Sequence, residues 1–221
     1  DLDMDQVANI IFKYFKNPVV KTKELPDLYV SNPAFKRVRS FSEKSKFLET
    51  NLVQLYSLDD LTEKERITTL YFYNFLLGGG GLNTKLYQLL REKNSLCYGV
   101  KSVYLKYDNL LLIQTSINKN DVKKAQRLIK QAFLEMKKGE FSEEELQNAK
   151  ESFIFSLNLS LDNPGGILNN YVFHILDHLP LIEDRIKMIE EITKEEIVAV
   201  ASKIKPNISF VLEGEEDHGN N

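Results

Sequence analysis

Cysteine and histidine are scarce in this 221-residue sequence, which contains one cysteine and three histidines. A single cysteine excludes an internal disulfide framework and is consistent with a reducing compartment. So few thiol and imidazole groups also leave little material for a zinc site, because such sites draw mainly on cysteine and histidine. We therefore expect no metal to be held by this segment.

Long apolar runs are missing as well. No stretch approaches the roughly 18 residues of a membrane span, and the opening Asp-Leu-Asp-Met-Asp-Gln does not resemble a signal peptide. We therefore expect a cytoplasmic protein with no membrane partner. A large excess of one charge is also lacking, since 29 basic and 32 acidic residues give a net charge of −3. Nucleic acid is accordingly not an expected partner.

What is present fits a globular domain. Hydrophobic residues make up 43% of the chain and charged residues 28%, which excludes a fully disordered protein. The chain opens directly on apolar residues at helical spacing, without a starting methionine: Val7, Ile10, Ile11, Tyr14 and Phe15. We expect a fragment of something longer, with a single domain over residues 1–213 and a polar tail over 214–221.

Apolar periodicity predicts both strands and helices. Loose alternation favours strands over 35–41 and 47–58, a hairpin over 97–107 and 110–117 with a two-residue loop, and a last strand over 207–213. Helical spacing runs from 122 to 136, and capping boxes begin at Thr62, Ser142 and Thr193. Residues 42–45 are expected to form a turn. The pattern predicts an α+β fold, with helices packed on one face of a single, mostly antiparallel sheet.

Four consecutive glycines, Gly78–Gly81, follow a helix that is apolar on nearly every side. A glycine run before a helix invites a phosphate-binding interpretation. The nucleotide motifs, however, require a strand before the run, and the P-loop requires Gly-Lys-Ser/Thr, which is absent here. We instead expect the glycines to permit positive φ angles and the close approach of another backbone.

The pentapeptide His174-Ile-Leu-Asp-His178 differs by one methylene from the inverted zinc motif. Two histidines four residues apart share one face of a helix. No third ligand is evident, Pro180 follows immediately, and the surrounding apolar residues fit ordinary packing. A structural role is therefore favoured. Binding of zinc by His174 and His178 stays open as an alternative.

The segment from Leu90 to Val100 brings a helix end, a short turn and a strand start together. Arg91 and Tyr98 therefore fall within reach of each other. A guanidinium and a phenol are hydrogen-bond donors that suit a peptide carbonyl or a developing oxyanion. Cys97 is expected to be a buried thiol on a strand.

The sequence Phe75-Leu-Leu-Gly-Gly-Gly-Gly-Leu-Asn-Thr-Lys-Leu-Tyr-Gln-Leu-Leu-Arg-Glu-Lys-Asn-Ser-Leu-Cys-Tyr-Gly-Val100 resembles the zinc-less half of pitrilysin/insulinase-type metallopeptidases, which include mitochondrial processing peptidase. The order of elements is similar over nearly the whole chain. In that family two homologous α+β halves close like a clamshell around an unfolded peptide. One half holds zinc through His-x-x-Glu-His and a distal Glu.

The resemblance implies that this chain is the substrate-binding C-terminal half, with Arg91 and Tyr98 contacting the peptide. It implies a zinc-bearing homologous half as partner, on the same chain or a separate subunit, with zinc as the cofactor there. It also implies that the first strand of the half is missing. His-x-x-Glu-His is absent, so this segment alone carries no catalytic residue and is expected to be inactive. The rival hypothesis is a scaffold or assembly subunit that has lost peptidase activity.

Overall fold

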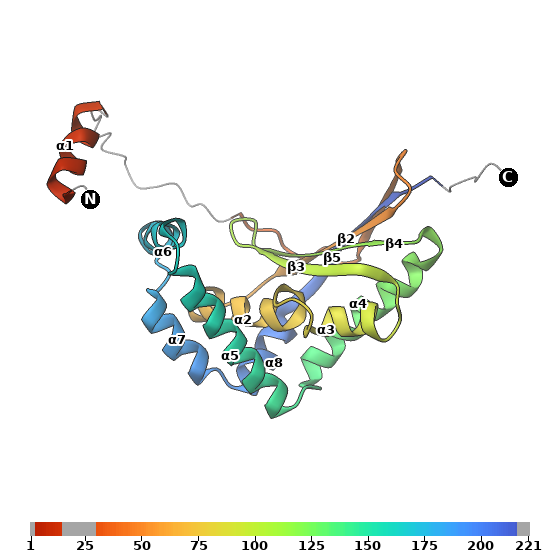
Figure 1. Ribbon diagram of the computed structural model, residues 1–221. Helices are drawn as coiled ribbons and strands as arrows, with labels where there is room; N and C mark the ends of the chain where they lie inside the picture. The colour runs from red at the N-terminus through yellow and green to blue at the C-terminus, as the bar shows by residue number, and fades with distance from the viewer. Residues whose placement is uncertain (1–2, 15–29, 216–221) are drawn as a thin grey trace.

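The computed structural model describes residues 3–14 and 30–215. A five-stranded sheet lies along one side, and most of the helices gather beneath it (Figure 1). The strands are β1 (Arg39–Lys44), β2 (Thr50–Leu58), β3 (Cys97–Leu105), β4 (Leu110–Ile117) and β5 (Ile204–Glu213). The α-helices are α1 (Met4–Tyr14), α2 (Leu70–Asn74), α3 (Lys85–Tyr87), α4 (Val122–Lys138), α5 (Glu143–Ser160), α6 (Pro164–Asp177), α7 (Ile182–Glu191) and α8 (Lys194–Lys203).

Short helical segments extend these helices. The π-helical turns η1 (Glu65–Thr69) and η2 (Phe75–Gly79) flank α2, so that the helix predicted from about 63 to 77 is present as one run. A third π-helical turn, η3 (Gln88–Glu92), continues α3, and the 3₁₀ turn η4 (Lys119–Asp121) precedes α4. None of the helices within the described ranges is long and apolar enough to cross a membrane.

The strand order is β1-β5-β2-β4-β3, which leaves β1 and β3 at the two edges. Neighbouring strands pair antiparallel except β1 and β5, which are parallel. Both the predicted α+β class and the mostly antiparallel sheet are confirmed. The helix at the start of the chain is also present as α1, although no residue of it is buried.

Several strand limits differ from the prediction. The turn expected at Ser42–Ser45 is wrong, because β1 begins only at Arg39 and continues through Lys44 beside β5. Every residue of β1 is exposed, so burial imposes no alternation that a sequence pattern could show. β5 starts at Ile204 and therefore includes Pro206. The register between β2 and β5 shifts at this point, which accommodates a residue that cannot donate a ladder hydrogen bond.

The β3–β4 hairpin has a loop of residues 106–109 rather than the expected two-residue loop, because the last strand pair is Leu105 with Leu110. Asn109 adopts a φ of 52°, and its side-chain amide donates to the Leu58 carbonyl oxygen at 2.8 Å. Asparagine tolerates this left-handed conformation better than most residues. The loop is thereby tied to the end of β2.

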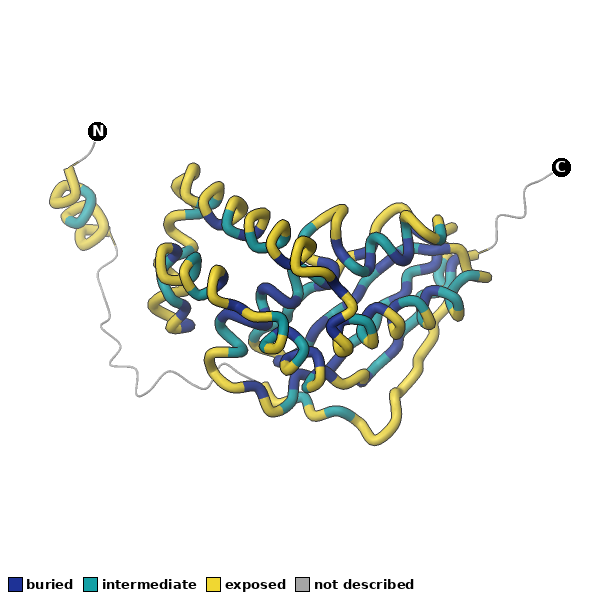
Figure 2. The backbone as a smooth tube through the Cα atoms, turned by 90° about the horizontal axis from the view of Figure 1, so that it is seen from below, coloured by how far each residue is buried: buried dark blue, intermediate teal, exposed yellow. Residues whose placement is uncertain are grey.

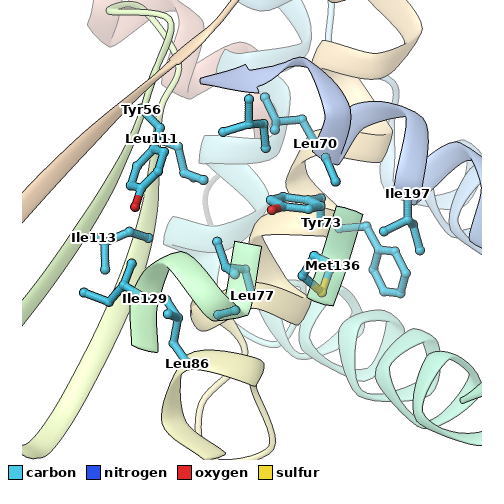
Figure 3. Packing of buried hydrophobic residues seen from close by; sticks show 14 of the residues in the cluster. Tyr56, Leu70, Tyr73, Leu77, Leu86, Leu111, Ile113, Ile129, Met136 and Ile197 are labelled. Carbon is cyan, nitrogen blue, oxygen red and sulfur yellow. The ribbon is translucent and has the colours of Figure 1, made fainter. Parts of the chain in front are cut away.

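The hydrophobic core lies where the helices face the sheet, as the buried residues in Figure 2 show. In Figure 3, Tyr73 and Leu77 of the glycine-bearing helix lie between Leu111 and Ile113 of β4 and Met136 of α4. All five side chains are at most 1% exposed. The central position predicted for this helix is confirmed.

Capping boxes begin the helices where the sequence predicted them. At Ser142 and Thr193 both reciprocal hydrogen bonds are present. At Thr62 the hydroxyl accepts from the Glu65 amide at 3.2 Å, and the Glu65 carboxylate accepts from the Thr62 amide at 2.7 Å. Of the predicted polar tail, only residues 214 and 215 are described, and both donate backbone hydrogen bonds to the segment around the start of β2. The single domain over 1–213 stays a prediction.

The glycine run is explained by close packing rather than by a ligand. A Cβ added at Gly78 would lie 2.8 Å from Leu86 Cδ1 and 3.0 Å from the backbone nitrogen of Ser102 in β3. The expected close approach is therefore made by a strand of this same chain. Gly81 adopts a φ of 87°, a conformation that glycine takes without steric cost.

We expect Gly78→Val to lower the free energy of unfolding by about 1–3 kcal/mol, because the added atoms must displace the Ser102 backbone. Gly99→Val is the matched control, since nothing lies within 4 Å of a Cβ at Gly99; its effect should stay within about 0.5 kcal/mol. Urea denaturation followed by circular dichroism measures both. An equal decrease in the free energy of unfolding for the two variants would contradict the explanation that Gly78 is required by close packing against β3.

Candidate functional site

Arg91 and Tyr98 lie on either side of a tight turn that joins η3 to β3. Ser95 takes a φ of 51° within this turn. The turn is closed by backbone hydrogen bonds from Ser95 to Arg91 and from Leu96 to Leu90, each 2.9 Å long. The side-chain amide of Asn94 donates to the Leu89 carbonyl at 2.9 Å. Leu89 and Leu90 are buried, so the helix end that carries Arg91 is anchored in the core.

A β-bulge at the start of β3 sets the direction of Tyr98. Cys97 pairs with Ile117, whereas the next pair joins Val100 to Thr115, so β3 has one residue more than β4 over this interval. A bulge of this kind bends the strand and redirects side chains. The Thr115 hydroxyl donates to the Gly99 carbonyl at 2.9 Å and holds the bulge. As a result, the Tyr98 side chain is 86% exposed.

The structure brings the two predicted side chains together. Arg91 Cζ lies 5.3 Å from the centroid of the Tyr98 ring, a distance at which a guanidinium is attracted to an aromatic face. Arg91 Nη1 also donates to the Cys97 carbonyl oxygen at 3.3 Å, which restrains the side chain. Cys97 is buried, as predicted.

Hydrogen-bond donors of this pair remain available for a ligand. Within the described ranges, the Tyr98 hydroxyl has no protein partner, and Arg91 forms no ion pair with a carboxylate. Neither residue lines the cavity beside α4, the cavity beside the glycine run or the cavity beside α6. The pair therefore sits on an open surface beside the edge strand β3, where a large ligand can reach it.

No group of three or more His, Cys, Asp or Glu side chains in the described residues is arranged to hold a metal ion. His174 Nδ1 lies 2.8 Å from the Leu179 carbonyl oxygen, and His178 has a φ of 52° and ends α6. The two histidines therefore do not continue along one helix face. Asp177 is used elsewhere, in an ion pair with Lys106 at 2.8 Å.

The glycine run does not form a phosphate cradle. Gly78 and Gly79 belong to η2, and the Gly80 amide donates to the Phe75 carbonyl oxygen at 2.9 Å. A cavity of about 450 Å³ does lie beside the run, lined by Gly80, Thr84, Gln88 and Lys93, among others. No local sequence pattern indicates this cavity, because its far wall comes from α4 and α5.

Sequence comparison finds two curated relatives of interest, both from Bacillus subtilis. The chain is 26% identical over 219 residues to the probable inactive metalloprotease YmfF, covering 98% of the chain and 50% of that protein. It is 32% identical over 101 residues to the uncharacterized zinc protease YmxG, covering 45% of the chain and 24% of that protein. The chain thus spans about half the length, or less, of the curated relatives it matches.

Solved structures share the fold. A conserved protein from Enterococcus faecalis superposes with a TM-score of 0.82 at 23% identity, over 100% of this chain and 51% of that one. A peptidase M16 inactive domain from Pseudomonas fluorescens gives a TM-score of 0.73 at 21% identity, over 97% of this chain and 52% of that one.

The family that matches this chain is a peptidase domain family, in agreement with the resemblance to metallopeptidases that the motif around Arg91 and Tyr98 indicates. The family model for the peptidase M16 inactive domain matches residues 1–153, which is more than half of the chain. The sequence lacks His-x-x-Glu-His, and the family description names an inactive domain. The chain therefore belongs to the peptidase M16 inactive domain family.

Proposed function

We propose that this chain is the substrate-binding, zinc-less half of a zinc metallopeptidase that cleaves short or unfolded peptides. Arg91 and Tyr98 contact the peptide carbonyl at the scissile bond. The described residues offer no ligand set for zinc, so the metal belongs to a homologous half, on the same chain or on a separate subunit. This chain alone is then inactive.

The exposure of Tyr98 beside Arg91 carries this proposal. An aromatic side chain that is 86% exposed buries little of its surface in the domain and so contributes little to its stability. The bulge and the Thr115 hydrogen bond nevertheless hold it beside a guanidinium. Two donors fixed on an open surface suit a ligand presented from outside the domain.

The contribution of the pair is electrostatic. A peptide carbonyl oxygen gains negative charge when its carbon is attacked, and donors fixed in advance stabilise that charge. The Arg91 guanidinium supplies charged donors and the Tyr98 hydroxyl a neutral one. Both act on the transition state more than on the bound substrate, and the effect should therefore fall on kcat.

In the full-length protein assembled with its zinc-bearing half, Tyr98→Phe should lower kcat about 100-fold, the loss typical of removing one such donor. KM for a fluorogenic peptide should change little. Tyr171→Phe is the matched control, because Tyr171 is 55% exposed on α6 and belongs to no proposed site. An unchanged kcat in Tyr98→Phe would refute the role of the hydroxyl.

A loss of activity must be separated from a loss of folding. Tyr98→Ala should change the free energy of unfolding by no more than about 0.5 kcal/mol, because the side chain is largely in water. Leu90 lies on the other side of the same turn and is fully buried. Leu90→Ala should therefore lower the free energy of unfolding by about 2–5 kcal/mol. Chemical denaturation of the same preparations measures both values. A large loss in Tyr98→Ala would make the residue structural.

The second candidate function is a scaffold without peptidase activity, and the name of YmfF, a probable inactive metalloprotease, favours it. Native mass spectrometry of the full-length protein separates the two functions. One zinc per pair of halves supports the peptidase. A zinc-free assembly supports the scaffold and leaves Arg91 and Tyr98 without a catalytic partner.

A further inference from the structure

Arg185, in the first turns of α7, lines a cavity of about 600 Å³. The cavity lies between the tip of the β3–β4 hairpin and helices α5, α6 and α7, at the end of the domain where α6 is drawn in Figure 1. Its walls include Tyr71, Asn170 and Phe173. Arg91 and Tyr98 are not part of it.

The guanidinium of Arg185 has no carboxylate partner among the described residues. Its one hydrogen bond is a long one, 3.5 Å from Nη1 to the side-chain oxygen of Asn170. Burial lowers the pKa of Arg185, which reflects the loss of water around the charge. Arginine withdrawn from water in this way is ordinarily paired with an acid.

The other charges around the cavity are already accounted for. Lys106 pairs with Asp177 at 2.8 Å, and the Tyr107 hydroxyl donates to the same carboxylate at 3.1 Å. On α7 itself, Asp184 Oδ1 lies 3.6 Å from Lys187 Nζ, and both side chains are well exposed. Asp108 lines the rim but is exposed to solvent. One guanidinium is thus left to face the cavity.

Apolar side chains, among them Leu157, Phe173 and Leu179, line much of the rest of the cavity, and the neutral Ser160, Asn169 and Asn170 are part of its wall as well. One cation without an acid partner in the described residues, beside apolar side chains, matches a ligand with one negative charge and one apolar group. A carboxylate accepts two parallel hydrogen bonds from a guanidinium. A phosphate dianion would bring a second charge for which no further unpaired cation is present in the described part of the cavity.

We infer that this cavity binds the α-carboxylate of a peptide, with Arg185 pairing with the carboxylate and the apolar wall receiving the last side chain. The choice of a peptide as the carrier of the carboxylate rests on the proposed function. The cavity lies at the opposite end of β3 from Tyr98. Tyr104 lies six positions after Tyr98 in the extended strand, which is roughly 20 Å, so a tripeptide in the cavity does not reach Tyr98.

Isothermal titration calorimetry on the full-length protein tests the inference with N-acetyl-Ala-Ala-Leu as the free acid and as the amide. The acid should bind at least tenfold more tightly than the amide. Arg185→Met should abolish this difference, and Arg185→Lys should retain only part of it. Arg127→Met is the matched control, because Arg127 lines a different cavity beside α4.

Equal binding of acid and amide, or a difference that survives in Arg185→Met, would overturn the inference. The unfolding temperature of Arg185→Met without peptide is the second readout. It should equal or exceed that of the unsubstituted protein, since an unpaired desolvated charge has been removed; a marked fall would make Arg185 a structural residue.

Failure here is distinguishable from failure of the proposed function. Tyr98→Phe should leave tripeptide affinity unchanged while it lowers kcat. Equal binding of acid and amide beside a lowered kcat in Tyr98→Phe would overturn this inference alone. An unaltered kcat in Tyr98→Phe beside an Arg185-dependent preference for the acid would overturn the role of Tyr98 alone.

Discussion

The contact between the glycine-bearing helix and strand β3 holds the candidate site in place. Gly78 approaches the backbone of Ser102 so closely that a Cβ would lie 3.0 Å away, and the Ser102 hydroxyl donates to the Asn74 carbonyl at 3.0 Å. The part of the chain between Gly78 and Ser102 carries Arg91 and Tyr98. Because both of its ends are fixed to the core, the pair keeps its position although Tyr98 itself is largely in water.

Two kinds of charged side chain line the cavity beside α6. Lys106 and Asp177 form a closed ion pair with the Tyr107 hydroxyl, which satisfies both charges and ties the hairpin tip to α6. Arg185 is withdrawn from water without such a partner in the described chain. The first arrangement is complete within the domain, as structural ion pairs are. The second has no acid partner within the described residues, which is the observation on which the inferred carboxylate site rests.

The local sequence determined much of the architecture. Apolar spacing identified the central helix over 63–77, and Ser or Thr followed three residues later by Glu identified the helix starts at Ser142 and Thr193. These signals are local because capping and helical periodicity involve residues within one or two turns. The proximity of Arg91 and Tyr98 could also be predicted, since a helix end, a short turn and a strand start leave the intervening chain few conformations. The functional role of this pair stays a prediction.

The tertiary structure decided what depends on distant segments. β1 is an exposed edge strand whose only ladder partner in the described chain is β5, so neither burial nor alternation marks it in the sequence. The bulge that exposes Tyr98 exists only in the register between β3 and β4. In the sequence, nothing distinguishes Arg185 from an ordinary arginine on a helix. Only in the folded chain does it line a cavity together with α6 and the tip of the hairpin. Sequence patterns report neighbours along the chain, whereas the pairing or isolation of a charge is set by neighbours in space.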